Sequence, residues 1–143
     1  MTNLDARRHV VFSQYRELPV PASLANSFLC FWKQEIIGSG GYVHRVLPDA
    51  CVDMVFMHDA LPVVVGSWTD PFVVRLSAGT TIVGARLHAG RAPGILLIAA
   101  AELLNRSVTL CDCRAARGSN LPSMSQRLFR SLTPWRVLRC VYA

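Results

Sequence analysis

The sequence lacks an apolar stretch long enough to cross a bilayer. Its longest apolar run, GILLIAAA at 94–101, has eight residues, whereas a spanning helix needs about 20. The first ten residues, MTNLDARRHV, carry charges with no apolar segment behind them, so they do not indicate a secretory signal. We therefore expect a soluble, cytoplasmic protein.

Motifs of several enzyme classes are also missing. The glycine cluster GSGG at 38–41 lacks the Gly-Lys-Ser/Thr ending of a phosphate-binding loop, and there is no G-x-S-x-G serine elbow. The histidines show neither H-x-H nor H-E-x-x-H spacing. The five cysteines are an odd number, which argues against a disulfide framework, and CDC at 111–113 has no second cysteine pair at zinc-like spacing. We expect no catalytic residue, no metal and no cofactor.

Acidic residues are absent from the last part of the chain. Residues 1–112 hold nine basic and nine acidic side chains, so they sum to zero. The remainder carries six arginines and no acid, and it supplies the whole net charge of +6. Such a segment can follow a phosphate backbone, or it can be a solvated helical end.

What the sequence does contain is a series of short apolar runs bounded by Pro or Gly. A chain of 143 residues can bury one sizeable core, and we expect a single domain over 1–143. A short helix is predicted from Pro21. Strands are predicted for the runs FLCFWKQEII, GYVHRVL, CVDMVFM, LPVVVGS, PFVVRLS and TTIVGARLH. Short strands at this spacing favour a β-rich barrel or sandwich over about 10–90.

After Gly90 the apolar pattern changes to steps of three and four, which predicts helices over about 91–143. The candidate stretches are APGILLIAAAELLN, LPSMSQRLFRSL and TPWRVLRCVYA. In the last of these, Trp135, Leu138 and Val141 share a helical face. An uncovered apolar stripe of this kind predicts a homodimer with these helices near the interface.

The stretch HRVLPDACVDMVF, at 44–56, combines a turn with two unusual charges. LPDAC fits a type I turn with Pro48 and Asp49 at its centre, followed by a left-handed residue at Ala50. In the hairpin that this turn would form, Arg45 faces Asp53.

Both faces of the second strand of that hairpin are apolar, so Asp53 is expected to be partly buried and to need a partner. Arg45 is the nearest candidate and Arg86 the next. The two charges can be a structural pair, a ligand-binding pair or part of a catalytic site, and the structural pair is favoured. Trp32 and Trp68 can line a pocket or belong to the core.

Four stretches together carry a family resemblance. YRELPVPASLANSFLCFW, HRVLPDACVDMVF, VVVGSWTDPFVVRL and VGARLHAGRAPGILLIAAAELLNRSVTL follow one another over about residues 15–132. In this order they resemble the N-terminal domain that precedes the helix-turn-helix pair in a group of AraC-type transcription regulators. The resemblance implies an α+β fold, a cupin-like β-barrel followed by C-terminal helices. It also implies a domain that senses a small effector or mediates dimer contacts.

The chain departs from that family in two ways. The two DNA-reading helix-turn-helix units are absent from 1–143, so we expect no sequence-specific DNA binding by this chain alone. Ala50 also stands where the family often has Gly.

These expectations define a non-catalytic sensor with a possible small-molecule effector. Its candidate ligand-binding residues are Trp32, Arg45, Asp53, Trp68 and Arg86. Two alternatives remain open. One is a small cupin-type enzyme that holds a metal with His44 and His88, and the other is a nucleic-acid-binding module that uses the arginine-rich end.

Overall fold

Eight strands and four short helical segments make up the part of the chain, residues 10–115, that the computed structural model describes. The strands are β1 (Val11–Leu18), β2 (Phe28–Gly38), β3 (Gly41–Val46), β4 (Asp53–Met57), β5 (Val63–Val65), β6 (Phe72–Ser77), β7 (Thr81–Leu87) and β8 (Ser107–Thr109). The helical segments are α1 (Ala92–Leu96), α2 (Leu110–Ala115) and the 3-10 turns η1 (Ala22–Leu24) and η2 (Ala100–Leu103). No helix in this part is long and apolar enough to cross a membrane.

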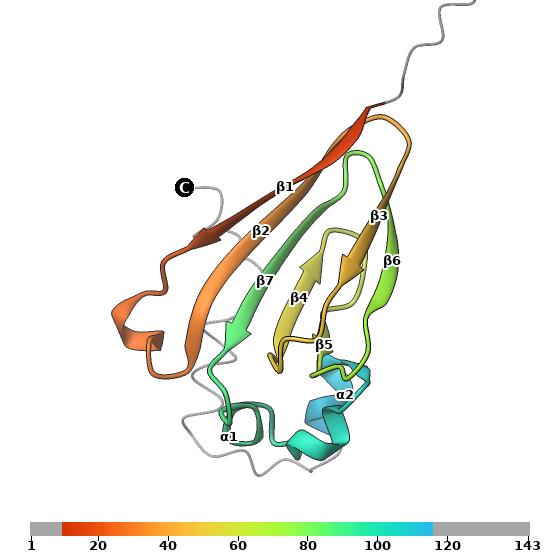
Figure 1. Ribbon diagram of the computed structural model, residues 1–143. Helices are drawn as coiled ribbons and strands as arrows, with labels where there is room; N and C mark the ends of the chain where they lie inside the picture. Colours follow the sequence, from red (N-terminus) through yellow and green to blue (C-terminus); the bar gives the residue numbers. More distant parts are fainter. Residues whose placement is uncertain (1–9, 116–143) are drawn as a thin grey trace, which may run out of the picture.

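The strands form two antiparallel sheets (Figure 1). The larger has the order β1-β2-β7-β4-β5-β8, and the smaller consists of β3 and β6. Tight glycine-containing links carry β2 into β3 and β6 into β7. Because β2 and β7 are neighbours in the large sheet, β3 and β6 become neighbours in the small one.

The link from β2 to β3 depends on a glycine. Gly38 has a φ of +109°, and a Cβ at this position would lie 1.9 Å from the carbonyl oxygen of Val10. Only glycine combines that backbone conformation with so close an approach. The chain can therefore leave β2 sharply and start the second sheet.

The expected hairpin between β3 and β4 does not exist, and of its expected turn only the left-handed residue is confirmed. Ala50 has the left-handed φ of 56°, and the Asp49 carboxylate accepts a hydrogen bond from the Cys51 backbone N–H at 3.0 Å. The segment connects the two sheets instead of pairing two neighbouring strands, because β4 pairs with β5 and β7.

The expected α+β fold, with a closed cupin-like barrel and C-terminal helices, is wrong. The described part is mostly β, its two sheets are open, and its helices are short. The predicted helix over APGILLIAAAELLN breaks because Leu97 takes the left-handed conformation that ends α1, and Ala99 is extended before η2. The other two predicted helices, at 121–132 and 133–143, lie outside the described residues, and so does the apolar stripe at Trp135.

One hydrophobic cluster lies between the two sheets. Alternate residues of β2 and β7 face the small sheet, and they pack against alternate residues of β3 and β6. The members are Cys30, Trp32, Ile36, Leu76 and Ile82, with Val11, Tyr42, Val55 and Val74 at the margin. We call this side of the large sheet its inner face.

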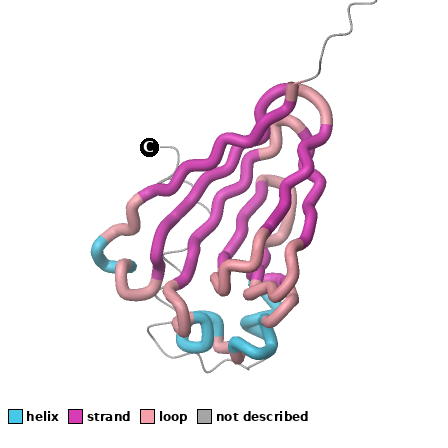
Figure 2. The backbone as a smooth tube through the Cα atoms, viewed as in Figure 1, coloured by secondary structure: helices cyan, strands magenta, loops and turns pink. Residues whose placement is uncertain are grey.

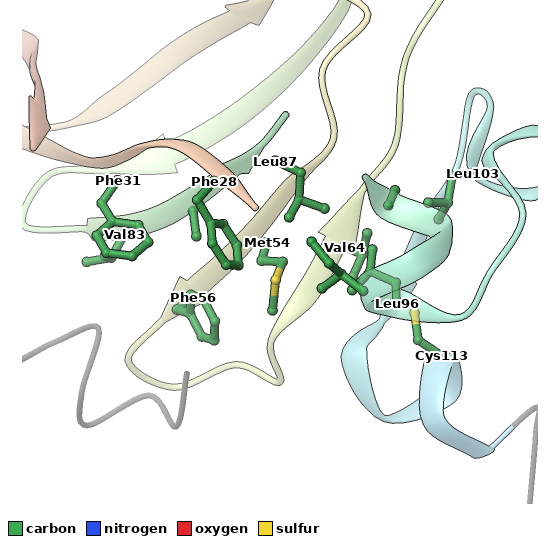
Figure 3. Packing of buried hydrophobic residues seen from close by; sticks show 13 residues of the cluster. Phe28, Phe31, Met54, Phe56, Val64, Val83, Leu87, Leu96, Leu103 and Cys113 are labelled. Carbon is green, nitrogen blue, oxygen red and sulfur yellow. The ribbon is translucent and has the colours of Figure 1, made fainter. Parts of the chain in front are cut away.

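A second cluster covers the opposite face of the large sheet and its helical end. Met54 and Val64 from the strands pack with Leu96 and Leu103 from the helical segments (Figure 3). Apart from η1, the helical segments gather at one end of the strands (Figure 2). They close that end, while the inner face carries the charged residues Asp53 and Arg86.

Candidate functional site

Asp53 and Arg86 are paired directly across two neighbouring strands. They are opposite each other in β4 and β7, where period-two alternation points both side chains to the inner face. Arg86 Nε donates to Asp53 Oδ1 at 3.0 Å, and Nη2 donates to Oδ2 at 2.9 Å. Two parallel bonds of this kind fix the geometry as well as the charge.

A second carboxylate reaches the same guanidinium. Asp49 Oδ2 lies 3.4 Å from Arg86 Nη2, so two acids surround one base. The hydrogen bond to Asp53 is the main cause that raises the pKa of Arg86 above its ordinary value, and burial opposes it. The side chains of Arg86 and Asp53 remain 23% and 16% exposed, so solvent or a small molecule can touch the pair.

Trp32 lies on the inner face beside this pair. It is opposite Gly84 in β7, whereas Cys30, two residues earlier, is opposite Arg86. A Cβ at Gly84 would lie 2.0 Å from the Trp32 ring atom Cε2, so the indole lies directly on the glycine backbone. The Tyr15 ring stands 6.0 Å from it, tilted by 34°. The sequence alone does not show that Trp32 requires a glycine at position 84, because a glycine within a strand has several explanations.

Trp68 lies in the loop between β5 and β6. Its ring packs on Phe72, with the two ring centres 4.3 Å apart. The neighbouring Ser67 hydroxyl donates to the carbonyl oxygen of Cys51 at 3.4 Å, close in sequence to Asp53. Because Phe72 is opposite Val46, Trp68 lies at the end of the small sheet from which the chain leads to Asp49.

Both indoles contain a buried donor that is not used. Within the described residues, Trp32 Nε1 and Trp68 Nε1 are the two buried side-chain polar atoms without a hydrogen-bond partner. Buried donors are nearly always satisfied in folded proteins, and leaving one unpaired costs about 1–3 kcal/mol. Each of these two nitrogens is therefore a donor that a hydrogen-bond acceptor would satisfy.

Arg45 does not belong to the site. It is exposed in β3, opposite Val73 of β6, and alternation puts it on the outer side of the small sheet. The expected pairing of Arg45 with Asp53 is wrong because it assumed a β3–β4 hairpin. The runner-up partner, Arg86, is the one found.

Sequence reasoning missed several neighbours of the pair. Tyr15 donates to the Glu17 carboxylate at 3.1 Å, and burial, followed by that hydrogen bond, raises the pKa of Tyr15. Burial also raises the pKa of the Cys30 and Cys51 thiols. Both thiols therefore stay protonated near neutral pH, and a protonated thiol is a poor nucleophile. Only a map of strand neighbours could have revealed these residues.

The two histidines of the metal hypothesis are bound to different partners. His44 Nδ1 lies 3.2 Å from Gln34 Nε2 between the sheets, whereas His88 Nε2 lies 2.9 Å from the carbonyl oxygen of Ala25. Across 10–115, no group of three or more His, Cys, Asp or Glu side chains is arranged to hold a metal ion. Of the CDC stretch, Cys111 is exposed and Cys113 is buried in the second cluster.

Comparison with known proteins gives one match. Residues 16–109 match a family described as a domain of unknown function (DUF6597). The match covers more than half of the chain, so the chain belongs to this family. No curated protein and no solved structure matches it.

Proposed function

We propose that this DUF6597 chain is the effector-sensing domain of an AraC-type transcription regulator, a non-catalytic cytoplasmic module. The resemblance over about residues 15–132 supports the regulator assignment. The unpaired indole donors of Trp32 and Trp68 support a ligand site on the inner face. The unpaired indole donors are the observation that carries the proposal.

The chemistry of the inner face favours an uncharged effector. Arg86 is already neutralised by Asp53 and lies near Asp49, and Glu17 adds a further acid at the margin. A carboxylate or phosphate ligand would gain no free positive charge there and would meet these acids. An aromatic molecule with a carbonyl or ether oxygen would pack on the Trp32 and Tyr15 rings and accept from an indole N–H.

A ligand panel tests this site directly. Thermal unfolding is followed with benzamide, acetanilide and coumarin, and with benzoate and phenylacetate as charged counterparts. Binding to the folded state raises stability by about 2.7 kcal/mol at a ligand concentration one hundred times Kd, which raises Tm by several degrees. We expect a response to members of the uncharged set and none to the carboxylates. A response to the carboxylates alone would contradict the proposal.

An isosteric replacement identifies the donor. In a variant with 3-benzothienylalanine at position 32, sulfur replaces the indole N–H and the ring keeps its shape. Removing an unpaired buried donor should stabilise the ligand-free protein by about 1 kcal/mol and abolish the ligand response. The same replacement at Trp68 is the matched comparison. A full ligand response in both variants would show that neither indole binds the effector.

A further inference from the structure

β1 forms an edge of the large sheet along its whole length. All eight of its residues are in regular register with β2, and no described strand pairs with its other side (Figure 1). Phe12 and Tyr15 are 49% and 48% exposed. The strand, VFSQYREL, contains neither Pro nor Gly and its register has no bulge, so three of the devices that protect an edge are missing from it.

The opposite edge differs. β8 has three residues, Ser107–Thr109, and α2 begins at the next residue. Such a short strand ending in a helix offers few backbone groups to a partner. Of the two edges of the large sheet, β1 is the one able to accept another strand.

We propose that a second copy of this chain pairs antiparallel with β1, with a two-fold axis at Tyr15, so that the large sheets of two molecules become continuous. The side chains of β1 are complementary to those of a second, antiparallel copy of the same strand. A two-fold axis perpendicular to a sheet keeps each face on the same side, so residues that meet across it must have the same parity. Only registers centred on a residue are therefore allowed.

The register centred on Tyr15 gives three matched pairs on either side of the axis. Gln14 lies opposite the partner's Arg16, so the guanidinium of Arg16 can donate a hydrogen bond to the side-chain oxygen of Gln14. Ser13 lies opposite the partner's Glu17, a hydroxyl donor against a carboxylate. Phe12 lies opposite the partner's Leu18, an apolar pair. Matched cross-strand pairs of these kinds are the unit of sheet stabilisation.

The neighbouring registers are poorer. A register centred on Gln14 sets Phe12 against the partner's Arg16 and Val11 against the partner's Glu17. A register centred on Arg16 sets the two Arg16 side chains against each other, and like charges directly opposite are destabilising. Among the registers centred on residues 14, 15 and 16, the sequence of β1 therefore favours the one centred on Tyr15.

This interface goes beyond the proposed sensing function and does not depend on it. The interface and the proposed ligand site are nevertheless neighbours. Tyr15 lies on the proposed axis and also stands beside Trp32 on the inner face. Its hydroxyl donates to Glu17 of the same strand. A ligand that moves the Trp32 ring would therefore act on a residue at the dimer axis.

Opposite charge changes at Gln14 test the interface. In Gln14→Glu, a carboxylate would lie opposite the partner's Arg16, and the two-fold axis repeats this pair on the other side. In Gln14→Arg, two positive charges would lie opposite each other at both positions. Sedimentation velocity on the full 143-residue chain should show a dimer whose Kd falls about three- to tenfold in Gln14→Glu and rises by a similar factor in Gln14→Arg. Ser77→Arg, an exposed site in β6, makes the same charge change as Gln14→Arg on a strand that does not pair with β1, and it should leave Kd unchanged.

Folding defects cannot imitate this result. Within one molecule Gln14 lies opposite Glu35 of β2, so Gln14→Arg places opposite charges together inside the subunit and Gln14→Glu places like charges there. The stability of the monomer should therefore change in the direction opposite to that of the dimer. A wild-type chain that stays monomeric at 100 µM, or a Kd that Gln14→Glu and Gln14→Arg shift in the same direction, would overturn the proposal.

Cysteine cross-linking tests the register. Tyr15→Cys should give a disulfide-linked dimer across the axis under mild oxidation, faster than Gln14→Cys or Arg16→Cys, with the wild-type chain as background for its own cysteines. Faster linkage at Gln14 or Arg16 would move the axis and defeat the proposed pairing. A dimer that none of the three variants cross-links above background would place the interface away from β1.

Discussion

His44 is the residue whose titration should be visible in the stability of the fold. It lies between the sheets, and its Nδ1 is 3.2 Å from the side-chain amide nitrogen of Gln34. That amide nitrogen of Gln34 also donates a hydrogen bond to Ser13 Oγ at 2.8 Å. With Gln34 as the donor, the imidazole must be neutral and accept at Nδ1. Burial lowers the pKa of His44 below its ordinary 6.5, in agreement with that geometry.

The direction of the pH effect follows from this lowered pKa. In the unfolded chain His44 binds its proton near pH 6.5, whereas the folded protein binds it only at lower pH. The unfolded state therefore holds more protons in that window, and stability rises with pH. The contribution of neutral His44 is present above pH 6.5 and is lost as the pH falls below it.

We therefore predict that His44→Gln makes Tm less sensitive to acid between pH 7.5 and 5.5. The variant removes the titrating group and keeps polar atoms near Gln34. Thermal unfolding at a series of pH values is the measurement, with His58→Gln as the control, because His58 is fully solvent-facing at 95% exposure. An acid response that persists unchanged in His44→Gln would show that other groups cause it.

At the scale of the element, the crossing between β3 and β4 depends on a single unfavourable dihedral. Ala50 has a φ of 56°, a conformation that costs an L-residue with a Cβ about 1 kcal/mol. Glycine adopts it freely, although it also gives the unfolded chain more entropy to lose. Relief of the steric cost outweighs that entropy when the residue is locked in place, as the Asp49–Cys51 hydrogen bond indicates.

Ala50→Gly should therefore raise stability by about 0.5 kcal/mol, or Tm by about 1–2 °C. Ala78→Gly is the matched control. Ala78 lies in the β6–β7 turn without a positive φ, so the same change there should lower Tm. Scanning calorimetry on both variants is the measurement, and a Tm that falls by several degrees in Ala50→Gly would contradict the strain argument.

At the scale of the whole molecule, the net charge is concentrated in the last part of the chain. Residues 1–112 are neutral in sum, and the remaining residues supply the net charge of +6. Among the described residues, the short helices α1 and α2 lie at one end of the sheets. The arginine-rich end falls almost entirely outside the described residues, so the nucleic-acid hypothesis depends on the sequence alone.

We predict that the 143-residue chain gives no footprint on a defined operator at physiological salt. Phosphate contacts by arginine are independent of sequence and weaken steeply as salt rises. Gel shifts at 50 and 200 mM salt should show weak binding, with Kd on the order of 10⁻⁴–10⁻⁶ M at the higher salt. The binding should be similar for unrelated duplexes. Salt-resistant binding that distinguishes one sequence would contradict this expectation.

Strand positions were largely determined by the sequence itself. The runs that predicted β2, β3, β4, β6 and β7 coincide with those strands to within two residues at each end, because apolar runs bounded by Pro and Gly are a local signal. The left-handed Ala50 was also local, since turn chemistry depends on four adjacent residues. β1 was missed because an exposed edge strand need not alternate clearly between apolar and polar residues.

Tertiary structure decided which strands are neighbours, and with them the candidate site. Arg86 rather than Arg45 binds Asp53, because sharp links after β2 and before β7 take β3 and β6 into a separate sheet and leave β7 beside β4. Trp32 meets Gly84 for the same reason. Period-two alternation tells which residues share a face of one strand, but it carries no information about the adjacent strand, which long-range packing selects.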